Sequence, residues 1–248
     1  MMKKSGKRAE SEVIRGELRS AADAAKAAVL KSFFKTGPGE YGENDRFHGV
    51  PVPGVRKVVQ AHLDIPLSEV RKLLCSPYHE ERLAALLILV DQYRRGDRSR
   101  RKRIFDFYLS NTARINNWDL VDLSAPHIVG GHLFGRKTSI LTRLARSDNL
   151  WERRIAILAT HYFIRQGDGR ETLRLAGLLL GDPHDLIHKA AGWMLREAGK
   201  RCSMEDVCGF LDANAAVMPR TMLRYALERF PRDLRFRYMQ MGKNKDRR

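Results

Sequence analysis

The chain has 248 residues, which is enough for one or two ordinary domains or for a single solenoid. Hydrophobic residues make up 43% and charged residues 30%, as in globular proteins, and the apolar run 84–90 is too short to cross a bilayer. The basic start at 1–8 is followed by no apolar segment, so we expect no secretory signal and a cytoplasmic protein.

Positive charge is in large excess, with 46 lysines and arginines against 29 acidic residues and a net charge of +17. Such an excess attracts polyanions, and nucleic acid is the leading candidate, although a basic protein without such a partner stays open. Seven basic residues and one acid lie within 94–103. The three cysteines form no C-x-x-C pair, which argues against disulfides and structural zinc. We expect neither a metal nor a cofactor.

Helical periodicity dominates the first half of the chain. An apolar stripe predicts a helix over about 11–34, followed by a turn-rich stretch over 36–53. Prolines that suit a first helical turn then precede or open further helices. These are predicted at 53–62, 66–74, 77–94 and 98–110, with the run AALLILV at 84–90 inside a buried helix rather than a strand.

The second half repeats the pattern and contains no convincing strand. Helices are predicted at 117–134 with a break at Pro126, then at 137–145, 149–166, 169–180, 184–198, 203–213 and 218–229. Asp148 and Asp182 are predicted N-caps, and Gly167 and Gly199 are predicted helix stops.

Helix pairs recur at intervals of about 35 to 45 residues, the range of HEAT-type arrays. The sequence therefore predicts an all-α fold, a right-handed superhelical solenoid of HEAT-like repeats with a basic concave face. The expected organisation is a basic N-terminal tail at 1–10, one repeat domain at 11–232 and a basic C-terminal tail at 233–248. An irregular helical bundle is the alternative.

Two motifs have simple explanations. The segment 37–42 fits G-x-G-x-x-G, but no strand precedes it and acidic residues follow it, so we predict a loop between helices. His184 and His188 have the spacing of two metal ligands on a helix, but no third ligand is evident. We interpret them as residues at a helix start.

The segment 117–122, NWDLVD, carries more chemistry. On a helix, Trp118 and Asp122 share a face, where an indole and a carboxylate would meet a cationic ligand. An ordinary half-buried helix is the alternative. Gly192 precedes Trp193 in mid-helix, which indicates either a ligand close to the backbone or close helix packing. Trp151 is expected to pack in the first turn of its helix.

Together these segments resemble the DNA alkylation repair enzymes of the AlkD type over about 20–230. The matching motifs are NWDLVD at 117–122, SDNLWERR at 147–154, KAAGWMLRE at 189–197, and TGPGEYG at 36–42 with FHGV at 47–50. The resemblance implies a HEAT-like solenoid that excises cationic N3- and N7-alkylpurines, such as 3-methyladenine and 7-methylguanine, from duplex DNA. It also implies that the lesion stays stacked.

The resemblance further implies that Trp118 and Trp193 are active-site indoles, that Asp122 is the catalytic carboxylate and that Arg154 contacts DNA. An early helix would supply a third aromatic residue, for which Phe33, Phe34 and Tyr41 are candidates. The other expected phosphate contacts are Arg153, Lys189 and Arg196. The cluster at 94–103 is either a peripheral clamp or a solvated turn.

The expected function is that of a monomeric glycosylase in base excision repair, which hydrolyses the N-glycosidic bond without lyase activity. The main alternative is a non-catalytic HEAT-like protein that binds damaged or branched DNA. A HEAT-type adaptor for protein partners fits the high positive charge least well.

Overall fold

The computed structural model describes residues 9–241, and no β-strand occurs among them. This confirms the prediction of an all-α, helical-repeat fold. No helix in that range has the length and apolar character needed to cross a membrane. The chain divides into two compact units, Met1–Ser124 and Ala125–Arg248, and the single repeat domain expected over 11–232 stays a prediction. Each unit is described by itself, and the superhelix with its basic concave face stays a prediction.

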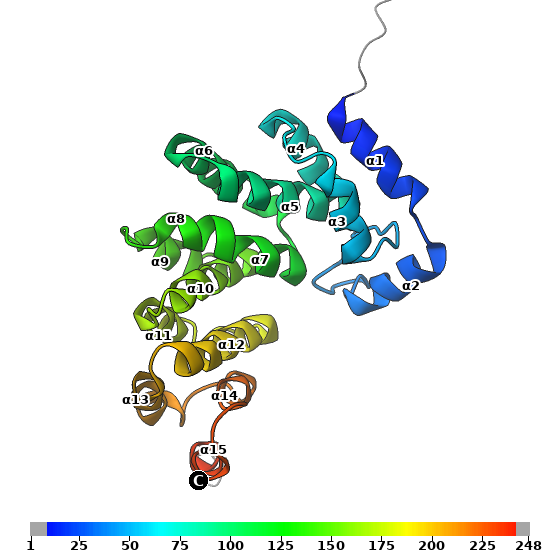
Figure 1. The fold of residues 1–248 in the computed structure, drawn as a ribbon. Helices are drawn as coiled ribbons and strands as arrows, with labels where there is room; N and C mark the ends of the chain where they lie inside the picture. Colours follow the sequence, from blue (N-terminus) through cyan, green and yellow to red (C-terminus); the bar gives the residue numbers. More distant parts are fainter. Residues whose placement is uncertain (1–8, 242–248) are drawn as a thin grey trace, which may run out of the picture. The chain divides into compact units, whose positions relative to one another are not determined.

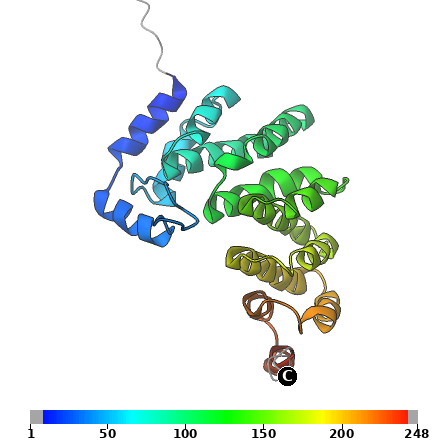
Figure 2. The ribbon, with the colours of Figure 1, turned by 180° about the vertical axis from the view of Figure 1, so that it is seen from behind.

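Unit 1 consists of helices that pack around one buried helix. In chain order they are α1 (Glu10–Ser20), α2 (Ala24–Phe33), α3 (Val52–Gln60), α4 (Leu67–Leu74), α5 (His79–Arg95), α6 (Arg98–Leu109), a 3-10 turn (Thr112–Arg114) and α7 (Trp118–Ala125). Helix α5 packs against α1, α3, α4 and α6, and both views of the ribbon show α1 beside α3 and α4 (Figures 1 and 2). The run at 84–90 is buried on all sides of α5, as the sequence predicts.

The first predicted helix, 11–34, is two helices. Asp23 separates them, because its carboxylate accepts the Lys26 N–H at 3.0 Å and so caps α2. Its own N–H donates to the His48 carbonyl at 2.9 Å. Gly49 has a φ of +85°, and a Cβ there would lie 2.0 Å from the Asp23 carbonyl oxygen. Only glycine allows this approach. It lets the loop before α3 cross the start of α2, at the turn between α1 and α2.

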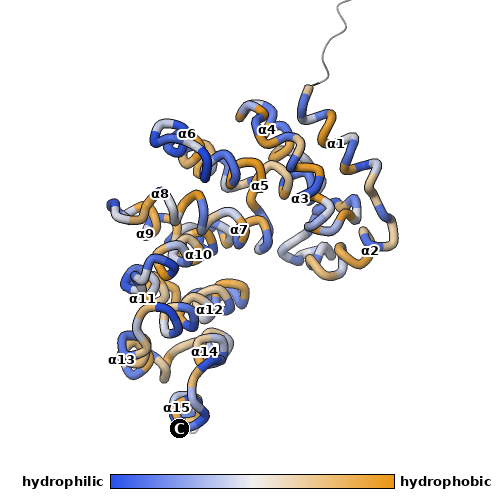
Figure 3. The backbone as a smooth tube through the Cα atoms, in the orientation of Figure 1, coloured by the Kyte–Doolittle hydropathy of each residue, from blue (hydrophilic) through white to orange (hydrophobic). Residues whose placement is uncertain are grey.

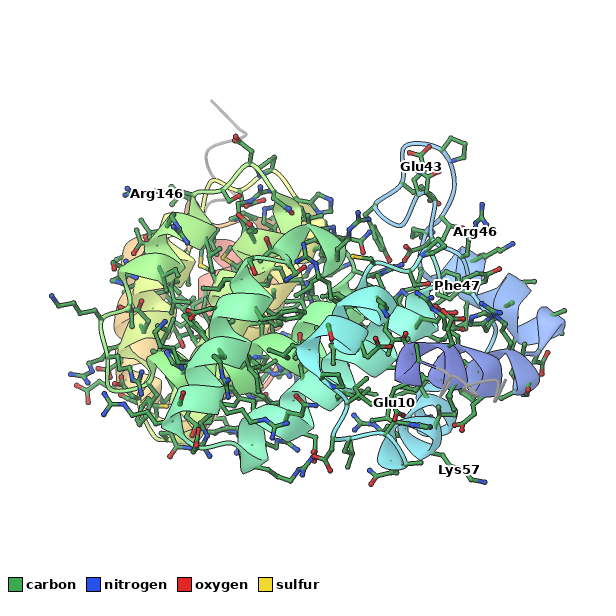
Figure 4. All side chains as sticks on the ribbon, turned by 90° about the horizontal axis from the view of Figure 1, so that it is seen from above. Glu10, Glu43, Arg46, Phe47, Lys57 and Arg146 are labelled. Atoms are coloured by element: carbon green, nitrogen blue, oxygen red, sulfur yellow. The ribbon has the colours of Figure 1, made fainter. Side chains whose placement is uncertain are left out.

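The G-x-G-x-x-G segment lies in a loop, as expected. The Gly37 N–H donates to the Glu40 carboxylate at 2.8 Å, and the Gly39 N–H donates to the Glu43 carboxylate at 3.0 Å. The loop's own acids therefore occupy the amides that a phosphate would need. Figure 4 shows Glu43 in this projecting loop and Phe47 nearer the helices.

Two buried glutamates at the start of α5 hold the segment that precedes α3. The Glu80 carboxylate accepts the backbone N–H groups of His48, Gly49 and Val50 at 3.0, 2.8 and 3.2 Å. The Glu81 carboxylate accepts Arg15 Nε at 2.9 Å and lies 3.0 Å from His48 Nε2. Full pairing makes these carboxylates tolerable in the core.

The third polar residue of this turn, His79, is buried between two carboxylates. Its Nδ1 lies 3.1 Å from Asp45 Oδ2, and its Nε2 lies 2.8 Å from Asp119 Oδ2. Burial lowers the pKa of His79, but the charge of Asp119 and the hydrogen bonds to Asp119 and Asp45 raise it to about 9. Arg82 donates to the other Asp45 oxygen at 2.5 Å. His79 is therefore an imidazolium at neutral pH that joins α5 to α7.

Unit 2 begins with a π-helical turn at Pro126–Gly130, the site of the predicted break, and continues as packed helices. These are α8 (Gly131–Leu133), α9 (Ser139–Ala145), α10 (Leu150–Arg165), α11 (Arg170–Leu178), α12 (Asp185–Arg201), α13 (Met204–Asn214), α14 (Arg220–Ala226) and α15 (Arg232–Gln240). Helix α12 packs between α10 and α14.

Two predicted N-caps in unit 2 are wrong by one and two residues, and one predicted helix stop lies inside a helix. Asn149 rather than Asp148 caps α10, because its side chain accepts the Trp151 N–H at 2.8 Å. His184 rather than Asp182 caps α12, and Asp182 instead accepts the His184 N–H at 2.8 Å. Gly199 stops no helix: it is buried within α12, where it faces Met204 and Val207 of α13. Gly167 does follow the end of α10, with a φ of +82°.

Gly192 reflects close helix packing rather than a ligand at the backbone. A Cβ at this position would lie 2.4 Å from the Met222 carbonyl oxygen and 2.6 Å from the Tyr225 Cβ, both on α14. The less specific of the two sequence interpretations is therefore right, and α12 and α14 pack closely because residue 192 has no side chain.

The C-terminal tail was predicted from 233, but α15 is a helix over part of it. The Tyr238 ring is buried, and its hydroxyl donates to the Cys208 carbonyl at 3.3 Å. Glu10 likewise belongs to α1, at the edge of the predicted N-terminal tail. The rest of the two predicted tails, 1–8 and 242–248, lies outside the described residues.

We expect the stability of unit 1 to depend on the charge of His79. Because its pKa is raised from 6.5 to about 9, its contribution is complete below pH 6.5 and is lost as the pH rises through 9. The difference in unfolding free energy between the wild type and His79→Gln should shrink by up to about 3 kcal/mol across that window. Chemical denaturation at several pH values measures this, and a constant difference would contradict it.

We expect Gly192→Ala to destabilise unit 2 by about 1–3 kcal/mol, because the new methyl group would collide with the α14 backbone. Gly209→Ala on α13 is the matched control, since a Cβ there meets nothing within 4 Å. It should stabilise its helix by up to about 1 kcal/mol. Denaturant unfolding compares the two, and equal effects would show that the close approach at Gly192 is unimportant.

Candidate functional site

Helix α7 carries the predicted indole and carboxylate four residues apart. Trp118 opens the helix and Asp122 follows one turn later, so both side chains lie on the same side, and both are half-buried. The fully buried Asn117 side chain accepts the Trp118 N–H at 2.8 Å. The backbone of the first residue of α7 is thus fixed by a hydrogen bond that it donates to the side chain of the preceding residue.

Aromatic side chains from the end of α2 support Trp118. The Phe34 ring is buried and stacks on the indole, with centroids 5.4 Å apart and an interplanar angle of 29°. Phe33 meets the same indole edge to face at 5.8 Å and is 58% exposed. Of the three candidates for a third aromatic residue, Phe34 supports the indole from inside, whereas Phe33 borders it at the surface. Tyr41 is half-buried in the loop that follows.

His79 and Asp119 help to hold the aromatic rings around Trp118 in place. The His79 ring lies 4.7 Å from Phe34 and 4.9 Å from Phe47, and its Nε2 contacts Asp119, the neighbour of Trp118. The imidazolium lies against two aromatic rings, an arrangement that favours its charged form. Sequence reasoning missed both residues. The sequence signal that could have indicated them was an acid, Asp119, in the first turn of one helix and a histidine, His79, at the start of a buried helix.

The negative charge of Asp122 affects a tyrosine in the core of unit 1. Burial raises the pKa of Tyr108, and the negative charge of Asp122 raises it further, against the effect of a hydrogen bond with Ser124. The Tyr108 hydroxyl and the Ser124 hydroxyl are 2.9 Å apart. A neutral phenol and a hydroxyl therefore lie within the electrostatic reach of a carboxylate that is itself partly open to solvent.

In unit 2, the predicted residues of α12 lie along one side of the helix. Lys189, Trp193 and Arg196 are separated by four and three residues, and all three are half-buried. The His161 ring of α10 is 5.8 Å from the Trp193 ring. Burial is the largest cause that lowers the pKa of His161, so the imidazole beside Trp193 is neutral at neutral pH.

Each basic residue predicted to contact DNA already has partners within unit 2. Arg153 pairs with Asp182 at 2.6 Å and donates to the Ser147 carbonyl at 2.9 Å. Arg154 is only 5% exposed and donates to a backbone carbonyl of α12, that of Leu186, at 2.6 Å.

The two basic residues on α12 are paired as well. Lys189 pairs with Asp185 at 2.7 Å, and Arg196 pairs with Glu228 and with Glu197. These contacts order the side chains of all four basic residues. Their binding to phosphate stays a prediction.

The basic cluster at 94–103 surrounds the start of α6. Asp97 caps this helix by accepting the Arg100 N–H at 2.7 Å, and Arg101 donates to the Tyr93 carbonyl at 3.0 Å. Arg95 pairs with Asp91 and Asp64. Part of the cluster therefore shapes the turn between α5 and α6.

The histidine pair at the start of α12 has structural contacts. The His184 side chain accepts the Leu186 N–H at 3.2 Å, and His188 Nε2 lies 2.5 Å from the Asp182 carbonyl oxygen. No group of three or more potential metal ligands occurs within residues 9–241.

A model of the DNA alkylation repair enzyme family matches residues 14–230. Among solved structures, the chain is similar to one described as a predicted DNA alkylation repair enzyme from Enterococcus faecalis. The TM-score is 0.65 at 15% sequence identity, over 85% of this chain and 97% of the other. None of the curated proteins compared with the chain matches it.

The structural similarity, at this low identity, shows the fold alone. The family model covers most of the sequence and includes α7, α10 and α12, the helices that carry the predicted site residues. The chain therefore belongs to the DNA alkylation repair enzyme family.

Proposed function

We propose that the protein is a DNA glycosylase that hydrolyses the N-glycosidic bond of cationic N3- and N7-alkylated purines in duplex DNA. Asp122 is the catalytic carboxylate, and Trp118 is an indole surface for the cationic nucleotide. The observation that carries the proposal is the pair on α7, where a partly open carboxylate follows a supported, partly open indole by one helical turn. Membership of the DNA alkylation repair enzyme family supports damaged DNA as the substrate.

The chemistry needs a negative charge and no general acid. A purine alkylated at N3 or N7 is cationic, so when the C1′–N9 bond breaks, its electrons neutralise the departing base. Positive charge then develops on the sugar, as in other glycoside cleavages. A fixed carboxylate stabilises that charge and takes the proton of the water that adds to C1′. The products are a free alkylpurine and an abasic site.

The surroundings of Trp118 suit a preformed surface. Its backbone is fixed by Asn117, one face of its ring stacks on Phe34, and Phe34 in turn packs on His79. A side chain held on two sides loses little entropy when a ligand binds. Cation–π attraction to such a surface contributes about 0.5 to 2 kcal/mol.

Phe33 is the third aromatic residue in this proposal. It borders Trp118 and is exposed, whereas Phe34 is covered by its neighbours and cannot reach a nucleotide. Phe33 and Trp118 would present an edge and a face to a purine that remains stacked in the duplex. A surface of this kind sets no limit on adduct size, so bulky adducts would be accepted.

For unit 2 we propose that the side of α12 with Lys189, Trp193 and Arg196 contacts DNA, and that Trp193 offers the second indole. Arg153 and Arg154 would contact phosphate from α10. The neutral His161 beside Trp193 leaves the indole available to a cation. Because these basic residues are ordered by internal partners, little entropy is lost when they bind phosphate.

We expect Asp122→Asn to slow the release of 7-methylguanine from methylated duplex DNA by about 100-fold or more, because the transition state loses its counter-charge. Single-turnover rates at saturating protein measure this. Asp106→Asn on the exposed side of α6 removes the same charge and should leave the rate unchanged.

Equal rates for Asp122→Asn and the wild type would remove Asp122 from the mechanism. If the wild type released no base but bound DNA in a salt-sensitive manner, the protein would be a non-catalytic binder of damaged or branched DNA.

We expect Phe33→Leu to lower kcat/KM for methylated duplex by about 2- to 5-fold, the factor equivalent to an exposed cation–π contact of about 0.5 to 1 kcal/mol. Affinity for undamaged duplex should not change, because leucine keeps the apolar surface. Phe134→Leu in unit 2, at a phenylalanine that is also exposed, is the control. A similar loss in both variants would mean that Phe33 has no special role.

A further inference from the structure

Helix α15 lies beyond the residues that the family model matches, which end at 230. The last 20 residues of the chain hold eight lysines and arginines against two aspartates, a net charge of +6 within a total of +17. The C-terminal end therefore carries a large share of the positive charge, and almost all of it lies outside the residues that the family model matches.

Contacts with α13 and α14 hold the helix in place. Tyr238 is buried, and its hydroxyl donates to α13. Arg237 pairs with Asp212 at 2.8 Å, and its guanidinium lies over the Tyr238 ring. Arg220 of α14 donates to the Met239 carbonyl at 2.8 Å. These contacts fix the position of α15 within unit 2.

Helix α15 also carries exposed arginines and an exposed aromatic ring. Phe236 is 66% exposed, and Arg232 precedes it by one helical turn. Arg235, its immediate neighbour, is exposed too. Arg232 and Arg235 form no ion pair or hydrogen bond through their side chains with any residue in 9–241. Figure 3 shows the resulting mixture of hydrophilic and hydrophobic residues along α15.

A charged side chain gains little from remaining unpaired, and a large apolar ring is stabilised by leaving water. Arginines around an exposed aromatic residue are the composition of nucleic-acid contacts, where guanidinium groups bind phosphates and the ring packs against sugars or bases. Since the family acts on DNA, the polyanion that matches this charge is already the partner of the protein.

We propose that α15 is an auxiliary anchor for duplex DNA, formed by Arg232, Arg235 and Phe236. The two arginines bind backbone phosphates and the phenylalanine packs against deoxyribose. The anchor depends on DNA as the partner and not on the glycosylase chemistry, because it acts on undamaged duplex as well as on a lesion.

The test is the affinity for a fluorescently labelled, undamaged duplex as a function of salt. In Arg232→Gln/Arg235→Gln, the slope of log affinity against log salt should fall by about two, because two phosphate contacts are lost. Arg56→Gln/Arg71→Gln, at two exposed arginines of α3 and α4, is the control for an equal loss of net charge. An equal change in both variants would overturn the proposal.

Phe236→Ser should weaken duplex binding without changing the salt slope, because an apolar contact releases no counterions. Val217→Ser is its control, since Val217 is 59% exposed and also lies in unit 2. No effect of Phe236→Ser beyond that of the control would remove Phe236 from the anchor.

Other partners are separate outcomes. If the arginine variant lost affinity only for single-stranded DNA, or only for phosphatidylserine vesicles, the assignment to duplex would be wrong. The single-turnover rate of base release at saturating protein should be unchanged in the α15 variants. The absence of base release in the wild type would refute the proposed function and leave the duplex-binding result valid.

Discussion

The charged imidazole of His79 is the interaction on which the rest of unit 1 depends. A buried cation needs counter-charges, and Asp45 and Asp119 provide them from two segments far from α5 in the sequence. Arg82 balances the second oxygen of Asp45, so each charge in the group has a partner. Removal of one member would leave another charge unpaired in the interior, which is far more costly than the loss of a surface ion pair. This group of buried charges therefore fixes how α5, α7 and the loop that precedes α3 meet.

That constraint extends to the candidate site through aromatic contacts. His79 packs on Phe34, Phe34 stacks on Trp118, and Asp119 joins the same imidazole to the first turn of α7. The indole is thus positioned by stacking on one side and through its own helix on the other. Asp122 lies one turn later on α7, so the position of that helix also sets the position of Asp122. In the proposed reaction, a carboxylate stabilises a transient charge on a sugar only when it is already in place, and the packing beneath α7 would hold Asp122 in that way.

The sequence was informative wherever a feature depends on neighbours along the chain. Trp118 and Asp122 share a helix face because four residues separate them, and the buried run at 84–90 indicated the central helix. Contacts between distant residues, such as Phe34 with Trp118, were not predictable, because no local pattern records which segments meet. Gly199 was misassigned for a related reason: a glycine near a helix end resembles a stop unless the packing of α13 against it is known. The arginine-rich composition after Pro231 predicts a basic tail, whereas Arg232–Gln240 form α15, in which Tyr238 is buried.

Net charge alone does not say which basic residues bind DNA. Arg153 and Arg196, which sequence reasoning placed at phosphates, are held by acidic partners, so part of the excess charge stabilises helix packing in unit 2. Such residues bind phosphate only if the ion pair opens or if the guanidinium uses a remaining N–H group. Arg232, whose side chain has no ion-pair or hydrogen-bond partner within residues 9–241, has no such competition there, and its proposed binding to phosphate would release counterions directly. The paired arginines of unit 2 therefore stabilise helix packing there, and in the proposed DNA contacts phosphate has to compete with their acidic partners.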